Sequence, residues 1–396
     1  MLTRTTSATS AVLSRRTSSL TLRVRGQTSS RQHKLGYPSV QPRLPVEITE
    51  AIFAFVLLSC PCPESKFSII HPFTQASKSF REIALRLYFR DIVIDSRALF
   101  VKVWDHLSTE NNVFRYGSDS FSWVRTLCGP SHIVAGRSIR NLGSFVNLHA
   151  LEICFASEGL KTQGSVVKQM LDSFANSPAR NTLKKLALTD IPSIDTKLLS
   201  ELAASFSKLK VLELSSTRRI DFDCCLICLD DTLAHTRHSP IPDYCSNADK
   251  LADSFARSLV PMTKLEELYL GLYLSDTDVL AEHVNHSDEI RGGRGVLSLF
   301  PSCETCGKFR EETQRRERQV SLAFLKAFPN LMTVRWDTLY PPSTSQNPES
   351  DEAGFYFPSE DELSAFRVPF TVAFVGHRHA NSGEVEGLSC QPLKLW

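Results

Sequence analysis

The segment "KLKVLELSS" (208–216) carries leucine at its second, fifth and seventh positions. Leu212 and Leu214 are two residues apart, so both point to the same face of an extended strand, and the charged Glu213 between them points to the other. Relaxed versions of the pattern occur at 147–155, 182–190, 264–272 and 330–338, as "NLHALEICF", "TLKKLALTD", "KLEELYLGL" and "NLMTVRWDT". The pattern therefore predicts five strands that bury one face each.

Helical periodicity occupies the chain between these phrases. The predicted helices are 165–177, 195–207, 247–259 and 318–328. A unit of strand, loop and helix that cannot bury its apolar face alone resembles the repeat of a leucine-rich-repeat solenoid. The five phrases are separated by 35, 26, 56 and 66 residues, so the resemblance is to irregular repeats with insertions. The resemblance implies a parallel sheet whose open face binds another protein.

A different pattern precedes the repeats. "RLPVEITEAIFAF" (43–55) reads as a helix with a proline in its first turn and apolar residues at helical spacing. A second helical stretch is expected at 73–89 and a strand at 90–95, and the prolines of "SCPCPES" (59–65) should end the first helix. One apolar face of the first helix needs a partner.

These two segments together resemble the F-box, particularly the versions found in large fungal F-box families. In that family the Leu-Pro pair and the first helix bind the small Skp adaptor of SCF-type ubiquitin ligases. The resemblance implies that the adaptor-binding residues here are Leu44, Pro45, Ile48, Ile52 and Phe80. The connection at 59–72 departs from the family pattern.

The predicted fold class is accordingly α+β, with a small helical F-box module followed by an irregular leucine-rich-repeat solenoid. The predicted segments are a disordered basic tail at 1–40, the F-box-like module at 41–95, the repeat body at 96–340, an acidic linker at 341–365, and a C-terminal strand and tail at 366–396. Cysteine-containing insertions are expected near 218–246 and 285–313.

Charge is distributed unevenly along the chain. Residues 1–46 hold eight Lys or Arg and no carboxylate, and subtracting this +8 from the net +2 leaves −6 for the rest. A body of that charge does not predict nucleic-acid binding. The Ser/Thr/Arg-rich tail indicates disorder, with a mitochondrial transit peptide as the alternative. Without an apolar run long enough to span a bilayer, we expect no membrane contact and a location in the cytoplasm or nucleus.

The eleven cysteines are odd in number and irregularly spaced, which favours reduced thiols over a disulfide framework. Two Cys-x-x-Cys pairs lie in the insertions, at Cys225 and Cys228 and at Cys303 and Cys306. Four thiolates suit a structural zinc ion, but the separation of the pairs exceeds that of a zinc ribbon. Free cysteines are the alternative, and we expect no required cofactor.

The sequence contains none of the nucleophile-elbow, phosphate-loop, dinucleotide or metalloprotease motifs. We therefore predict a protein that is not an enzyme: a substrate adaptor of a ubiquitin ligase that binds the Skp adaptor and an unknown target protein. The alternative is a mitochondrial or cytosolic zinc-stabilised repeat protein that acts as a scaffold without a ligase role.

Overall fold

The structure is a computed structural model that describes residues 44–59, 66–113, 119–134, 142–216, 247–272, 274, 304–338, 370–378 and 385–393. The chain divides into two compact units, Met1–Pro45 and Val46–Trp396. Only Leu44 and Pro45 of the first unit are described. The predicted basic tail, the acidic linker and the insertion at 218–246 therefore lie outside the described residues.

The strands of the second unit form one nine-stranded sheet in which each strand pairs with the next along the chain. Neighbours from β1 to β7 are parallel, and β8 and β9 continue the sheet in antiparallel fashion. The strands are β1 Asp91–Val93, β2 Thr126–Pro130, β3 Ala150–Cys154, β4 Lys185–Ile191, β5 Val211–Ser216, β6 Glu267–Gly271, β7 Thr333–Thr338, β8 Phe370–Arg378 and β9 Val385–Leu393.

The repeated phrases form consecutive strands because their leucines are in register. Leu186 of β4 pairs with Leu151 of β3 and with Leu212 of β5, and all three are fully buried. The same row continues outward to Ile92 of β1 and Val334 of β7. The prediction of five strands that each bury one face is confirmed.

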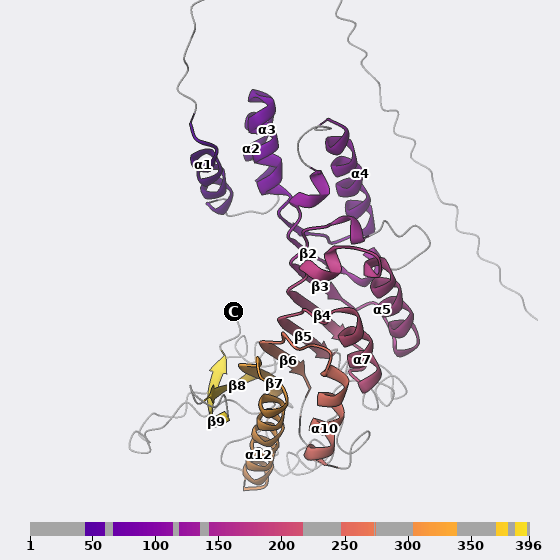
Figure 1. Ribbon diagram of the computed structural model, residues 1–396, viewed down its shortest axis with the longest axis vertical. Coiled ribbons are helices and arrows are strands. Elements are labelled where there is room, and N and C mark those ends of the chain that lie inside the picture. The colour runs from indigo at the N-terminus through magenta and orange to yellow at the C-terminus, as the bar shows by residue number, and fades with distance from the viewer. Residues whose placement is uncertain are drawn as a thin grey trace, which may run out of the picture. The chain divides into compact units, whose positions relative to one another are not determined.

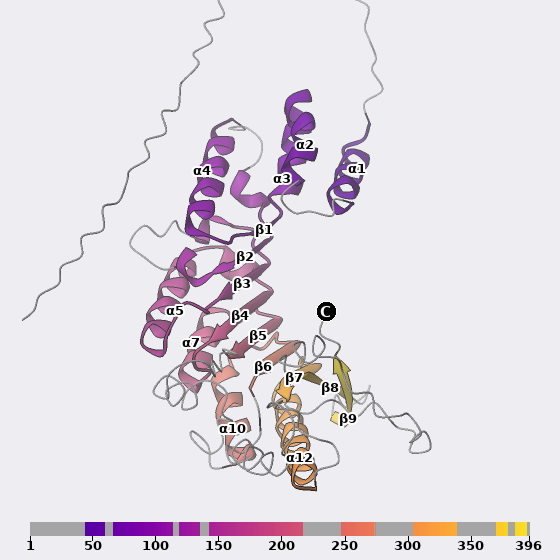
Figure 2. The same cartoon turned by 180° about the vertical axis from the view of Figure 1, so that it is seen from behind.

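Helices connect most of the parallel strands and cover one face of the sheet. They are α4 Arg97–Val113, α5 Leu160–Phe174, the single turn α6 Ala179–Thr182, α7 Thr196–Ser205, α10 Ala248–Leu259 and α12 Glu304–Ala327. Figures 1 and 2 show α5, α7 and α10 following one another along the same side of the strands, and α12 contacts α10. Side chains of Asp195 and Asn247 cap the amino termini of α7 and α10.

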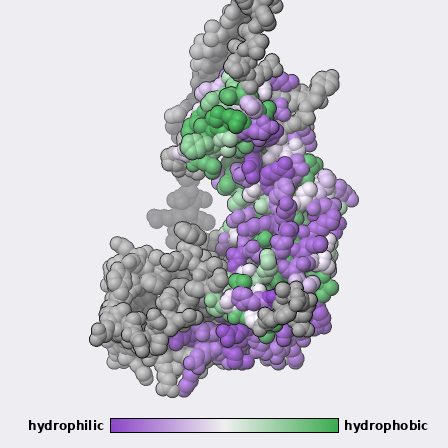
Figure 3. Space-filling model, turned by 60° about the vertical axis from the view of Figure 1, so that its left-hand side comes forward, coloured by the Kyte–Doolittle hydropathy of each residue, from purple (hydrophilic) through white to green (hydrophobic). Residues whose placement is uncertain are grey.

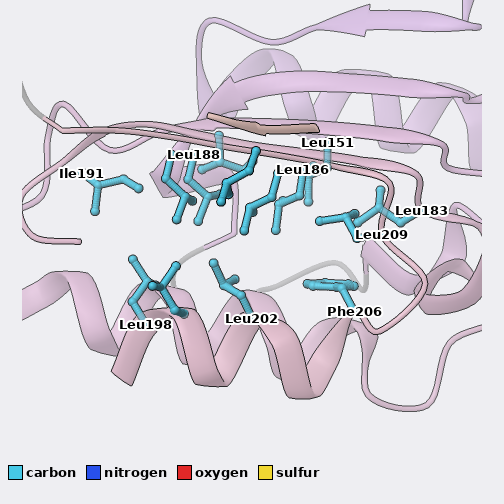
Figure 4. Packing of buried hydrophobic residues seen from close by; sticks show 14 of the residues in the cluster. Leu151, Leu183, Leu186, Leu188, Ile191, Leu198, Leu202, Phe206 and Leu209 are labelled. Carbon is cyan, nitrogen blue, oxygen red and sulfur yellow. The ribbon is translucent and has the colours of Figure 1, made fainter. Parts of the chain in front are cut away.

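The main core lies between the sheet and this helical layer. Figure 4 shows Leu186 and Leu188 of β4 pointing toward Leu198 and Leu202 of α7, with Phe206 at the end of that helix. All of these side chains are buried. Each buried aliphatic side chain stabilises the fold by about 1.5–3 kcal/mol, so the repeated leucines contribute substantially to the stability of the sheet.

Three helices precede the sheet: α1 Val46–Leu58, α2 Lys66–Ala76 and α3 Lys78–Tyr88. They enclose a second, smaller core around Phe53, Ile70, Ile83 and Ala84. The single helix expected at 73–89 is wrong, because Ser77 adopts an extended conformation and caps α3 through the Phe80 amide.

The connection at 59–72 is partly helical, because α2 begins at Lys66. Pro72 lies inside α2, where it removes one backbone hydrogen bond. The burial of Ile70 and the packing of Phe73 against this core offset that loss.

Three further differences from the sequence prediction concern segment boundaries. The end of the expected insertion at 285–313 is helical, because α12 begins at Glu304. The expected C-terminal tail contains a second strand, β9. Strand β2 was not predicted, since Gly129 stands where the pattern expects leucine, and a Cβ atom there would lie 2.9 Å from Ile133. Helices and a sheet are thus both present, as the predicted mixture of elements requires.

Candidate functional site

Helix α1 is apolar on two opposite faces, unlike an ordinary surface helix. Its inner face inserts Phe53, which is 3% exposed, between α2 and α3. The Phe53 ring lies 4.6 Å from the ring of Phe73 and 5.9 Å from that of Phe80, measured between centroids. These aromatic contacts fix the rotation of α1 about its axis and determine which residues face outward.

The outward face carries four large apolar side chains, which we call the α1 apolar face. Ile48 is 49% exposed, Ile52 45%, Phe55 70% and Leu58 84%. They recur three or four residues apart, so they lie on one side of the helix. Figure 3 shows hydrophobic residues gathered in the upper part of that view, where Figure 1 places the first helices. A contiguous exposed apolar surface of this kind makes the α1 apolar face a candidate interaction site.

The five residues predicted to bind an adaptor have different environments. Ile48 and Ile52 belong to the α1 apolar face, and Leu44 is 59% exposed in the short described segment before α1. Pro45 is also exposed. Phe80 is half-buried and packs against the small core, so its ring supports α1 from beneath. The predicted site omitted Phe55 and Leu58, although their spacing from Ile52 and from each other was a sufficient signal.

An ion pair attaches the three helices to the sheet region. Arg81 of α3 donates from Nε to Oε2 of Glu110 in α4 at 3.2 Å, and from Nη2 to the other carboxylate oxygen. The Glu110 side chain is only 1% exposed. His106 Nε2 lies 3.8 Å from the same carboxylate, and burial lowers the pKa of this imidazole. This bidentate contact holds α3 on α4 in one orientation.

A second ion pair joins α1 itself to α3. Glu50, one turn into α1, accepts a charge-assisted hydrogen bond from Arg86. Together with the aromatic contacts of Phe53, this pair presents the α1 apolar face on a fixed support.

The face of the sheet opposite the described helices carries a network of charged side chains on β4 to β7. Lys185 Nζ lies 2.7 Å from one oxygen of Glu213, and Arg335 Nη2 lies 2.6 Å from the other. Burial alone would raise the pKa of Glu213, but Lys185 and Arg335 together hold it below its usual value. The Glu213 carboxylate is therefore ionised at neutral pH.

The same network reaches the far end of β7. The guanidinium carbon of Arg335 lies 5.4 Å from the ring centroid of Tyr269, and the Tyr269 hydroxyl donates to Asp337 Oδ1 at 2.5 Å. Thr371 of β8 donates to the same oxygen at 3.4 Å. These contacts join polar side chains of β4 to β8 into one network, in which Asp337 and Thr371 are themselves buried.

The predicted zinc ligands fall mostly outside the described residues. Cys225, Cys228 and Cys303 lie there, and Cys306 is placed only as part of the backbone of α12. Within the described residues, no cluster of three or more His, Cys, Asp or Glu side chains has an arrangement that could bind a metal ion. The zinc site stays a prediction.

No helix in the described part of the chain is both long enough and apolar enough to cross a membrane. No protein-family model matches the sequence, and no curated protein matches it either.

Proposed function

We propose that this protein is a substrate-recognition adaptor of an SCF-type ubiquitin ligase. In this proposal the three N-terminal helices are an F-box that docks the Skp adaptor through the α1 apolar face. The sheet and its helices are an irregular leucine-rich-repeat solenoid that binds the target protein.

The observation that carries the proposal is the exposure of one whole face of α1. Apolar residues on a helix are normally buried, because exposed apolar surface is unfavourable in water. Here Phe53 is covered by α2 and α3, whereas Phe55 and Leu58 are open to solvent. A partner that covers Ile48, Ile52 and Phe55 would complete the environment of this helix, in the helix-in-groove mode of recognition.

The repeat resemblance supports the second half of the proposal. The leucines at the first, fourth and sixth positions of the phrase at 183–188 are all buried, and the corresponding strands follow one another in chain order. This stacking leaves the side of the sheet with Glu213, Tyr269 and Arg335 without a helical layer among the described elements. A sheet face of this kind is an extended surface for a protein ligand.

The proposed mechanism is proximity. A target held on the sheet face, on a body attached rigidly through Arg81 and Glu110 to the adaptor-docking helices, has its lysines near a ubiquitin-charged carrier. The effective concentration of the target is raised, and this chain performs no chemical step itself. The proposal requires no cofactor and places the protein in the cytoplasm or nucleus.

The test is direct binding of the purified full-length chain to a purified Skp adaptor, measured by calorimetry. An Ile52→Ala/Phe55→Ala double variant should weaken binding by at least about 30-fold, as expected for interface hot spots. A Leu44→Ala/Pro45→Ala variant examines the preceding segment separately.

Val260→Ala is the matched control, because Val260 is an exposed apolar residue at the end of α10. It should bind as the unmodified chain does. The proposal fails if the folded chain does not bind the adaptor, or if the control loses as much affinity as the double variant.

A further inference from the structure

A row of basic side chains runs along one edge of the sheet, at the residue that immediately precedes each strand. We call Arg90, Arg125, His149, Lys184 and Lys210 the basic row. Backbone hydrogen bonds fix their alignment, because the amide of each later member donates to the carbonyl of the preceding one. These distances lie between 2.7 and 2.9 Å. Five consecutive strands therefore place a basic residue at the same position.

The spacing of the row follows from sheet geometry. Neighbouring strands are about 4.8 Å apart, so the four intervals from Arg90 to Lys210 cover roughly 19 Å. Arg90, Lys184 and Lys210 are exposed, and Arg125 and His149 are half-exposed. Lys185 of β4 adds a further cation beside Lys184, although it is paired with Glu213.

The middle of the row has little charge compensation. Among the described residues, neither Arg125 nor Lys184 forms an ion pair, and the Arg125 guanidinium donates only to the Asn147 carbonyl, at 3.4 Å. At the two ends, Arg90 lies 3.9 Å from Asp91 and Lys210 pairs with Glu266.

His149 lies between these two cations in the row. Its pKa is lowered first by burial and then by the charges of Arg125, Lys184 and Arg90. A lowered pKa leaves the imidazole neutral at pH 7, so the positive potential at the centre of the row comes from Arg125 and Lys184.

The sign of the charge reverses at the next strand. Glu266 occupies the position after Lys210 in the same hydrogen-bonded row, and Glu267 follows it at the start of β6. Positive potential is consequently limited to the part of the edge formed by the first five strands.

We propose that the basic row binds an extended acidic segment of a protein partner, with Asp or Glu carboxylates facing Arg125 and Lys184. An extended chain advances about 3.3 Å per residue, so roughly six residues cover the row. This inference deepens the proposed function, because it assigns a chemical class to the target, and it rests on that proposal only for the target role.

A peptide fits this edge better than a nucleic acid does. A nucleic-acid strand carries negative charge along its whole length, and past Lys210 it would meet Glu266 and Glu267. An acidic protein segment ends where the positive potential ends, and a basic residue after it would face these two carboxylates. Discrimination by unlike and like charges of this kind gives specificity.

The test uses the full-length chain and a fluorescent hexaglutamate peptide, with hexaglutamine and a single-stranded RNA hexamer as comparison probes. Anisotropy at low ionic strength should show binding of hexaglutamate alone, weakened by added salt. An Arg125→Glu/Lys184→Glu double variant should bind it about tenfold more weakly or worse.

The matched control is Lys168→Glu/Lys197→Glu, which makes the same charge change at exposed positions on α5 and α7. It should stay within about twofold of the unmodified chain. Lys184→Gln adds no negative charge and should give a smaller loss of hexaglutamate affinity than the double variant. It keeps the test decisive if the double variant misfolds.

Preferential binding of the RNA hexamer, absence of hexaglutamate binding, or equal losses in the double variant and the control would each overturn the inference. Adaptor binding measured on the same variants separates the two proposals, because the α1 apolar face is unchanged in all of them. If the Arg125→Glu/Lys184→Glu variant loses hexaglutamate binding and still binds the adaptor, both proposals are supported. If the unmodified chain binds hexaglutamate but does not bind the adaptor, only the proposal for the basic row stands.

Discussion

Helices α1 and α10 are nearly equal in length, with 13 and 12 residues, but they treat their apolar residues in opposite ways. Helix α10 buries Leu251, Phe255 and Leu259, and its charged residues point outward. Helix α1 buries Phe53 and leaves Phe55 and Leu58 in solvent. Within the described residues, α1 therefore has one exposed apolar face, whereas the apolar residues of α10 are covered by its own core.

The two helices therefore show two different reasons why a position can carry an apolar side chain. In the sheet region an apolar residue is explained by the packing that it completes, as Phe255 is. On the outward side of α1, packing among the described residues explains none of the large apolar residues. Recognition of a partner, as proposed above, would explain these residues.

The largest contrast is expected between the two phenylalanines. Phe255→Ala removes a side chain that is 1% exposed, so the free energy of unfolding should fall by about 3–5 kcal/mol. Phe55→Ala should change it by less than about 0.5 kcal/mol, since the side chain is already in solvent. Urea denaturation of both variants measures the difference. Similar losses in the two variants would show that the outward face of α1 is part of the chain's own core.

The second prediction concerns Glu317, a carboxyl group that is buried in the sheet region. Burial raises the pKa of Glu317, on the inner side of α12, to about 8, although a hydrogen bond from Thr338 lowers it. The folded chain therefore keeps this proton up to a pH at which the unfolded chain has lost it. Stability is greatest below about pH 4.5 for this group and declines as the pH rises to about 8.

Between pH 5 and pH 8 this single group should cost about 3–4 kcal/mol of unfolding free energy. Glu317→Gln keeps the shape without titrating, so its urea midpoint should depend less on pH. The comparison of midpoints at pH 5, 6.5 and 8 decides the matter. Parallel pH profiles for the two chains would mean that the carboxylate is solvated or paired in the folded state.

The third prediction examines the junction between the two regions. Arg81→Met keeps the length and apolar part of the side chain but leaves the buried Glu110 carboxylate without its cation. Because the arginine is about one-third exposed, we expect a loss of only about 2 kcal/mol in the free energy of unfolding. Arg90→Met, which alters a weak surface pair at 3.9 Å, is the matched control and should lose almost nothing. Equal losses in the two variants would show that the ion pair of Arg81 and Glu110 does not specifically stabilise this junction.

The strands at the five repeated phrases could be predicted because large apolar residues, most of them leucine, stand two positions apart at the buried sites of each. Strand β9 could not, since "VEGLSCQPL" contains glycine and proline and pairs through its register with β8 alone. The predicted helix at 318–328 is shorter than α12, which begins at Glu304. The first half of α12 is so rich in charge that no apolar period indicates a helix.

The candidate site was predictable to a similar degree. Ile48 and Ile52 were identified from helical spacing and the F-box resemblance, but spacing alone cannot show that Phe80 turns beneath α1. The pair of Glu213 and Arg335 joins residues 122 positions apart, and the basic row needs the sheet register to bring its members together. Such contacts depend on tertiary structure and leave no local signal.

The smallest expected effects come from two matched helix caps, one in each region. Ser77 accepts from the Phe80 amide at the start of α3, and Asn247 accepts from the Lys250 amide at the start of α10. Replacing either by alanine should lower the free energy of unfolding by about 1 kcal/mol, because each substitution leaves one backbone donor without its cap. Thermal denaturation of the two variants should therefore give similar shifts. If Ser77→Ala were far more damaging than Asn247→Ala, local helix strength would distinguish the two regions. Equal shifts leave the packing of the apolar faces as the difference between α1 and α10.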